Sequence, residues 1–167
     1  MLNQKLEKEL NKQVNKELFS SYLYMSMNSY FQSIDMLGFA NWMYMQAQEE
    51  LSHAQKIYNF INERGGRIML EQIDKPKAEW DSPLKAFEES LIHEIFITDS
   101  INELLNIAIE EKDHATNIFL QWFVTEQVEE ESSVNDVIKK LKFMKDAPGG
   151  LFMLDKQLGQ RSLNSGE

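Results

Sequence analysis

Apolar residues recur three and four positions apart through four long segments, the spacing that places side chains on one face of an α-helix. Glycine and proline are scarce inside these segments and gather between them, as expected at helix boundaries. A short apolar segment follows Pro148-Gly149-Gly150 and is too short to be stable as an isolated helix. The pattern predicts helices at about residues 4–33, 37–64, 83–110, 114–142 and 150–159, within one domain of residues 1–167.

The connections predict how these helices run. Asp35-Met36-Leu37-Gly38 makes a short turn, so the first two helices are expected to be antiparallel neighbours. About 17 residues lie between the end of the second helix and Ser82. Fully extended, they span about 56 Å, which exceeds the roughly 42 Å of a 28-residue helix. We therefore expect an all-α four-helix bundle with a long crossover, parallel second and third helices, and a short fifth C-terminal helix.

Carboxylates interrupt each of the four apolar stripes near its middle. Isolated carboxylates almost never enter a protein core, because burying an unpaired charge is costly. Lysine and arginine are absent between residues 16 and 56, 85 and 112, and 112 and 139, so a basic side chain is not the expected partner. The pattern indicates a bound cation instead. The interrupting residues are Glu17, Glu50, Glu94, Glu126 and Glu130.

One histidine lies in the same register. His53 follows Glu50 by three residues, which places it nearly above Glu50 on the same helix face. Glu-x-x-His on one helix, with glutamates on facing helices, is how helical bundles hold a pair of metal ions. A single tetrapeptide of this kind is weak evidence, but glutamates at matching depth on three other helices make a metal pair the favoured interpretation.

Composition narrows the functional classes. The absence of cysteine excludes disulfides, iron–sulfur clusters and thiolate zinc sites. A net charge of −10 argues against nucleic acid as a partner and suits a protein that attracts cations. The first residues lack the apolar run of a secretory signal, and no stretch approaches a membrane span. We therefore expect a cytoplasmic protein with no membrane partner.

The donor set restricts the chemistry. Carboxylates with one imidazole are hard ligands that suit iron, manganese or zinc. A glutamate shared by two ions would hold them a few ångströms apart, and two Fe²⁺ ions can each give one electron to dioxygen. Paired Fe²⁺ oxidation is the reaction that this arrangement favours. A non-catalytic bundle that binds a structural cation is the alternative from a different class.

The whole chain resembles a prokaryotic non-haem ferritin, most clearly in FANWMYMQAQEELSHAQ of the second helix and FLQWFVTEQVEEE of the fourth. The resemblance implies a ferritin-like four-helix bundle and a ferroxidase that uses dioxygen or hydrogen peroxide. It also implies a homo-oligomeric shell of twenty-four subunits that stores ferric oxyhydroxide inside.

The resemblance assigns roles to individual residues. It implies two iron ions at a ferroxidase centre and a third ion nearby. The first iron would be bound by Glu17, Glu50 and His53, and the second by Glu50, Glu94 and Glu130. Tyr24 and Gln127 would lie close by as catalytic neighbours. The third ion would be bound by Glu49, Glu126, Glu129 and Glu130.

The alternative relative is the haem-binding bacterioferritin. That family carries a second Glu-x-x-His in helix four and a haem-ligating methionine. This chain has Glu126-Gln127-Val128-Glu129 instead, and Ser52 precedes His53. Both departures disfavour haem.

Several residues also have plainer interpretations. Tyr24 fits an ordinary buried tyrosine, Gln127 a polar surface position, and Glu49 a residue that points to solvent. We expect His93, His114 and Glu131 to be exposed. The apolar residues of the fifth helix are expected to pack on other subunits, because a filled four-helix core leaves them no room. These residues are Leu151, Phe152, Leu154 and Leu158.

Overall fold

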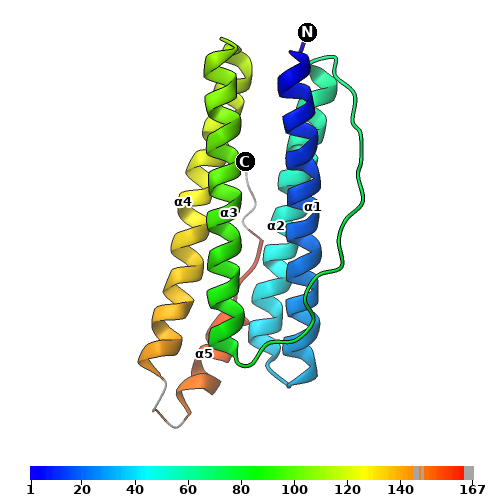
Figure 1. The fold of residues 1–167 in the computed structure, drawn as a ribbon. Coiled ribbons are helices and arrows are strands. Elements are labelled where there is room, and N and C mark those ends of the chain that lie inside the picture. The colour runs from blue at the N-terminus through cyan, green and yellow to red at the C-terminus, as the bar shows by residue number, and fades with distance from the viewer. Residues whose placement is uncertain (145–146, 148, 164–167) are drawn as a thin grey trace.

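The computed structural model describes residues 1–144, 147 and 149–163, and their regular structure is entirely helical (Figure 1). Pro148 and residues 164–167 lie outside the described residues. The helices are α1 (Gln4–Ser33), α2 (Leu37–Glu63), α3 (Pro83–Glu110), α4 (His114–Phe143) and α5 (Gly150–Leu158). The predicted all-α bundle with a short C-terminal helix is confirmed.

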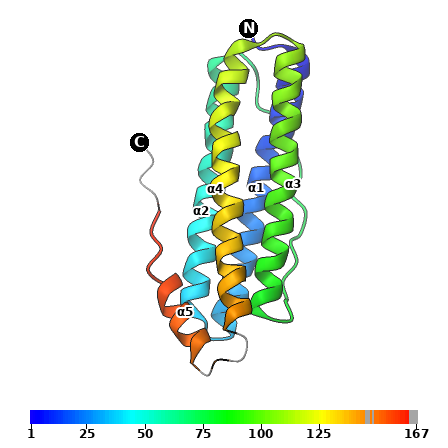
Figure 2. The ribbon, with the colours of Figure 1, turned by 90° about the vertical axis from the view of Figure 1, so that its left-hand side faces the viewer.

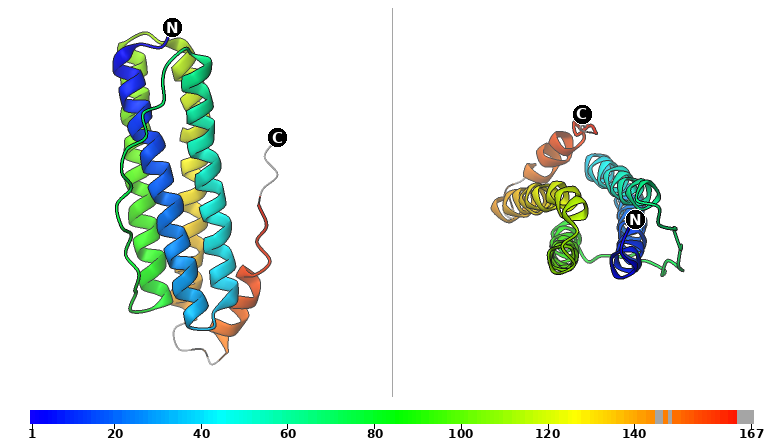
Figure 3. Two further views of the ribbon diagram at one scale, coloured as in Figure 1. Left: turned by 90° about the vertical axis from the view of Figure 1, so that its right-hand side faces the viewer. Right: turned by 90° about the horizontal axis from the view of Figure 1, so that it is seen from above.

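The long connection sets the topology of the bundle. α1 and α2 run antiparallel, and residues 64–82 return along the outside of this pair (Figure 1). α3 consequently begins at the end of the bundle where α2 begins, and α2 and α3 are parallel. Seen from above, the four long helices stand at the corners of a square (Figure 3). None of the helices in the described ranges combines the length and apolar character of a membrane span.

Side-chain caps fix where three of the helices begin. Asn3 accepts a hydrogen bond from the backbone at the start of α1, and Ser82 does so at α3, directly before Pro83. Asp113 caps α4 and also receives two hydrogen bonds from Arg64, of 3.0 and 2.9 Å. The Arg64 guanidinium lowers the pKa of Asp113 to about 2. This pair joins the end of α2 to the start of α4.

The apolar core consists of two separate clusters with a polar layer between them. One cluster includes Phe31, Phe39 and Phe87, and the other includes Leu10 and Ile101. The residues between them are buried although polar, so the bundle is held together mainly through its two ends. The buried polar residues are Gln13, Glu17, Ser20, Gln46, Glu50, His53, Ser90, Glu94, Thr116, Gln127 and Glu130. Thr116 is the exception in position, because it lies in the first turn of α4 and not in this layer.

The fifth helix packs on its own bundle, beside the start of α2 and the end of α4 (Figure 2). Leu154 and Leu158 are buried in the same apolar cluster as Phe39. The prediction that they need another subunit is therefore wrong, because the first turn of α2 offers a free surface for them. Leu151 and Phe152 remain exposed, and Phe152 keeps 75% of its surface accessible.

Asp155 of α5 supplies the cap that α2 lacks. Met36 precedes α2 and makes no side-chain capping bond. The Asp155 carboxylate instead accepts hydrogen bonds from the backbone of Gly38 at 2.8 Å and of Phe39 at 3.0 Å. A carboxylate at a helix N-terminus is favoured both by these free N–H groups and by the helix dipole. The position of α5 is thus tied to the first turn of α2.

We expect Gly38→Ala to separate α5 from α2. A Cβ at this position would lie 1.6 Å from the carbonyl oxygen of Asp155, so α5 has to move. Overpacking and loss of the cap together should lower the free energy of unfolding by roughly 2–4 kcal/mol, measured by denaturant titration. Gly159→Ala is the control, since its Cβ would meet ordinary contacts of 3.5 Å and more. Equal stability of the two variants would contradict this docking.

Candidate metal centre

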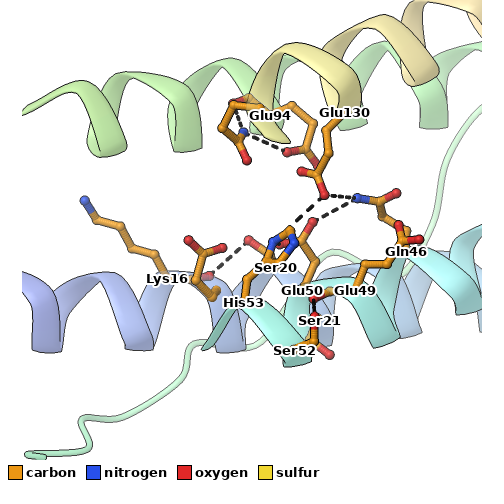
Figure 4. Close-up of polar contacts among 12 residues, drawn as sticks. Lys16, Ser20, Ser21, Gln46, Glu49, Glu50, Ser52, His53, Glu94 and Glu130 are labelled. Atoms are coloured by element: carbon orange, nitrogen blue, oxygen red, sulfur yellow. Dashed lines mark hydrogen bonds and ion pairs between the residues drawn. The ribbon is translucent and has the colours of Figure 1, made fainter. Parts of the chain in front are cut away.

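Carboxylates from all four long helices meet at one level of the bundle. Glu94 and Glu130 reach from α3 and α4 towards Glu50 and His53 of α2 (Figure 4). Glu17 joins them from α1, and each of these five side chains is at most 5% exposed. Each sits at a core position of its helix, which is why helical periodicity brings it inward.

The donor atoms form two groups that share one residue. Glu17, Glu50 and His53 each offer one atom within 4.8 Å of the others, and so do Glu50, Glu94 and Glu130. Glu50 belongs to both groups. This geometry suits two cations side by side with a carboxylate between them.

Three carboxylate oxygens of the centre have no hydrogen-bond donor. Glu17 Oε2, Glu50 Oε2 and Glu130 Oε2 are buried and accept no hydrogen bond. The nearest ring nitrogen, His53 Nδ1, is 3.5 Å from Glu50 and 3.9 Å from Glu130. Buried acceptors are normally satisfied, so three unpartnered oxygens on converging carboxylates fit cation ligands.

Burial and mutual repulsion raise the pKa values of these carboxyls. Burial, followed by the charge of Glu50, raises the pKa of Glu17 to about 8. Burial and the charge of Glu94 raise the pKa of Glu50 well above its ordinary value. The pKa of Glu130 rises through burial and the charges of Glu50 and Glu94. Without cations the centre therefore favours protons, and a divalent cation would replace them.

Two buried glutamines that the sequence reasoning missed hold the carboxylates in place. Gln13 Nε2 donates to Glu17 Oε1 at 2.8 Å. Gln46 Nε2 donates to Glu50 Oε1 at 2.9 Å and to Glu130 Oε1 at 3.1 Å. In each of these carboxylates the amide occupies Oε1 and leaves Oε2 for a ligand. The sequence feature that could have identified them is a glutamine four residues before a glutamate on the same helix face, which occurs at Gln13 and Glu17 and again at Gln46 and Glu50.

Tyr24 and Gln127 both contact Glu94. The Tyr24 hydroxyl donates to Glu94 Oε1, and Gln127 Nε2 donates to Glu94 Oε2 at 3.3 Å. Gln127 is 2% exposed, so its interpretation as a surface residue is wrong. Burial and the charge of Glu94 raise the pKa of Tyr24 well above its ordinary value. Its hydroxyl therefore stays protonated and remains a hydrogen-bond donor.

Aromatic rings surround the histidine of the centre. The His53 ring packs edge-on against Trp122 at 5.4 Å and against Phe123 at 5.9 Å between ring centroids. Lys56 Nζ lies 3.4 Å from the centroid of the Trp122 ring. These rings restrict the orientation of the imidazole and separate it from solvent on that side.

The residues predicted for a third ion lie less closely together. Glu126 and Glu130 approach His53, with one donor atom of each within 4.8 Å of the others. Glu129 is exposed, and Glu49 forms an ion pair with Arg161. The alternative interpretation, in which Glu49 points to solvent, is therefore wrong, because its side chain is largely buried against Arg161. The partner comes from beyond α5, where a helical pattern gives no indication of contact.

Two other expectations of exposure are also wrong. His93 is half-buried between α1 and α3, and its Nε2 lies 2.7 Å from Ser20 Oγ. Burial lowers the pKa of this imidazole. Glu131 is half-buried as well and accepts a hydrogen bond from Thr98. His114, by contrast, is exposed.

Comparison with known proteins agrees with this geometry. The family model of the ferritin-like domain matches residues 7–144. A bacterial non-heme ferritin of Bacteroides fragilis (strain 638R) is 42% identical over 161 residues, which cover 96% of this chain and 100% of that protein. A bacterial non-heme ferritin of Staphylococcus aureus (strain USA300) is 40% identical over 164 residues, with 98% and 99% covered.

Solved structures give the same result. An open pore ferritin from the hyperthermophilic archaeon Archaeoglobus fulgidus is 49% identical and superimposes with a TM-score of 0.96, over 97% of this chain and 100% of that chain. A structure described as a humanized archaeal ferritin is 50% identical, also with a TM-score of 0.96, over 98% and 99%. Sequence, fold and the buried carboxylate centre lead to one conclusion: this chain belongs to the ferritin family of iron-storage proteins.

Proposed function

We propose that this ferritin is a ferroxidase, which oxidises Fe²⁺ to Fe³⁺ and stores the product as a ferric oxyhydroxide mineral inside a hollow shell. Dioxygen or hydrogen peroxide is the electron acceptor. The observation that carries the proposal is the position of Glu50 in both donor groups, with unpartnered buried oxygens on Glu17, Glu50 and Glu130. Two Fe²⁺ ions are the substrates of this centre.

Each substrate ion has its own donor group. Glu17, Glu50 and His53 bind the first Fe²⁺, and Glu50, Glu94 and Glu130 bind the second. Each ion gives up one electron, and dioxygen with two protons takes the pair to become hydrogen peroxide. Placing the two ions on a shared carboxylate allows both electrons to leave from one site.

The charge of the centre suits two Fe²⁺ ions, and further carboxylates lie beside it. Four carboxylates supply a charge of about −4 when ionised, which matches two divalent ions. After oxidation the product leaves the centre for the mineral. Carboxylates outside the centre then attract the product. The third ion in this step would be bound by Glu126 and Glu130 beside His53, together with Glu49 and Glu129.

Assembly completes the proposal. The family relationship supports a homo-oligomer, and we propose a shell of twenty-four subunits. Leu51, Tyr58 and Leu70 line a groove on the outer face of α1 and α2 and keep much of their apolar surface exposed, as residues at subunit contacts do.

The relatives are non-haem ferritins by name, which favours a centre without haem over a bacterioferritin. A cytoplasmic location stays a prediction.

The proposal is tested by adding Fe²⁺ to metal-free protein in air. We expect a fast phase of ferric absorbance that ends near two Fe²⁺ per chain, followed by slower growth of a retained, electron-dense core. Protein first loaded with two Zn²⁺ per chain is the control, because redox-inert ions on the same ligands should remove the fast phase. Oxidation no faster than in protein-free buffer would instead favour a bundle that only binds a structural cation.

A further inference from the structure

The segment after α5 runs back along the side of α2 (Figures 2 and 3). Arg161 belongs to this segment. Arg161 Nη2 donates to Gln46 Oε1 at 2.9 Å and to Glu49 Oε2, and Nη1 donates to the carbonyl oxygen of Trp42 at 3.3 Å. The guanidinium also lies 4.3 Å from the centroid of the Trp42 ring. Asn41 Nδ2 holds the backbone carbonyl of Arg161 at 3.0 Å. Four residues of α2 thus bind one arginine.

This ion pair differs from an ordinary surface pair. The Arg161 side chain is 19% exposed and that of Glu49 is 17% exposed, so solvent screens the pair only in part. The flat guanidinium stacks on the indole ring and directs its N–H groups to three acceptors, an arrangement that lysine does not reproduce. The contacts therefore hold Arg161 against Glu49 more strongly than charge alone would.

The position of Arg161 connects it to the metal centre. Gln46 accepts from Arg161 with its carbonyl oxygen and donates to Glu50 and Glu130 with its amide. Glu49 directly precedes Glu50 in the chain, and the charges of Glu126 and Glu129 act on the Glu49 carboxyl. The guanidinium is consequently a positive charge among the carboxylates that lie next to the metal centre.

We propose that Arg161 is a tethered counter-ion of Glu49 and that a divalent cation has to displace it in order to bind there. The competition weakens cation binding at Glu49, so that an ion passes this position and is not retained. The inference rests on the proposed function only in naming iron as the ion that passes. The competition itself applies to any divalent cation.

The test uses Zn²⁺ as a redox-inert probe on the assembled, metal-free protein. Equilibrium dialysis over a wide range of Zn²⁺ concentrations measures the half-saturation of the weakest class of sites. We expect Arg161→Gln to lower this concentration about tenfold, because the competing charge-assisted hydrogen bond is lost. Lys156→Gln removes an equal charge from an exposed position of α5 and should leave it unchanged. The double variant Glu49→Gln with Arg161→Gln should lose the gain.

The direction of the effect separates competition from damage to the fold. Unchanged or weaker Zn²⁺ binding in Arg161→Gln would overturn the inference, and so would a gain that survives Glu49→Gln. Should Arg161→Gln fail to assemble, a chain that ends at Gln160 replaces it, with the same tightening expected. If the wild type oxidised iron rapidly while Arg161→Gln bound Zn²⁺ like the wild type, the inference would fail and the proposed function would stand.

Discussion

Glu50→Ala and His53→Ala should each reduce the initial rate of Fe²⁺ oxidation by about a hundredfold or more, the upper end of what loss of a supporting residue costs a metal site. Glu50 has the larger expected effect, because it alone contributes to both donor groups. His53 supplies the imidazole of the first group, and Trp122 and Phe123 hold its ring in place. Stopped-flow absorbance after mixing with two Fe²⁺ per chain measures the rate.

Two exposed residues provide matched controls for these variants. Glu63→Ala removes a glutamate at the exposed end of α2, and His114→Ala removes the exposed histidine at the start of α4. Both should oxidise iron at the wild-type rate. All four variants should keep the helical circular dichroism of the wild type, since the apolar clusters lie on either side of the centre. Wild-type rates of Fe²⁺ oxidation in Glu50→Ala and His53→Ala would contradict the assignment of the metal centre.

The sequence was sufficient to predict the bundle and the convergence of its carboxylates. Helical periodicity decides which face of each helix is buried, and position along the helix decides depth. Glu17, Glu50, Glu94 and Glu130 lie near the middle of their helices, so they meet at one level whichever way each helix runs. The Glu50–His53 spacing then places the imidazole one turn from the shared carboxylate. These relations depend only on local geometry.

The contacts of the C-terminal segment could not be predicted in this way. Arg161 meets Glu49 across 112 residues of sequence, and Asp155 meets Gly38 across 117. Neither contact belongs to a repeating pattern, because each arises from the docking of α5 on the end of the bundle. The free backbone groups at the start of α2 offered the one available signal, since Met36 cannot cap them.

The buried glutamines were a different kind of omission. Gln13 and Gln46 each stand one helical turn before a ligand candidate, yet a glutamine at the edge of an apolar stripe usually faces solvent. Both are 1% exposed. A buried carboxylate needs hydrogen-bond donors as well as a cation, and that requirement would have identified them.

The raised pKa values of the centre have a consequence for the stability of the metal-free protein. Glu17 has a pKa of about 8 in the folded chain against an ordinary value of 4.5. The folded state thus binds this proton more strongly than the unfolded state does. The contribution of protonated Glu17 to the stability of the fold is fully present below pH 4.5 and is lost as the pH rises through 8. The raised pKa values of Glu50 and Glu130 change the stability in the same direction. Asp113, with its pKa lowered to about 2, affects stability only at a more acidic pH.

Metal-free wild type should therefore melt at a lower temperature at pH 8 than at pH 6, and saturating Zn²⁺ should remove the difference. The loss amounts to a few kcal/mol at about 1.4 kcal/mol per pKa unit, and each kcal/mol lowers the melting temperature by roughly 2–4 °C in a chain of this size.

Glu130→Gln should raise the metal-free stability at pH 8 by about 1 kcal/mol, because an uncharged amide keeps the hydrogen bond from Gln46 and ends the repulsion with Glu50 and Glu94. Glu129→Gln, at the exposed neighbouring position, should leave it unchanged. Calorimetric melts of metal-free protein at the two pH values measure these shifts. A wild type that is more stable at pH 8 than at pH 6 would mean that the carboxylates of the centre do not repel one another in the metal-free fold.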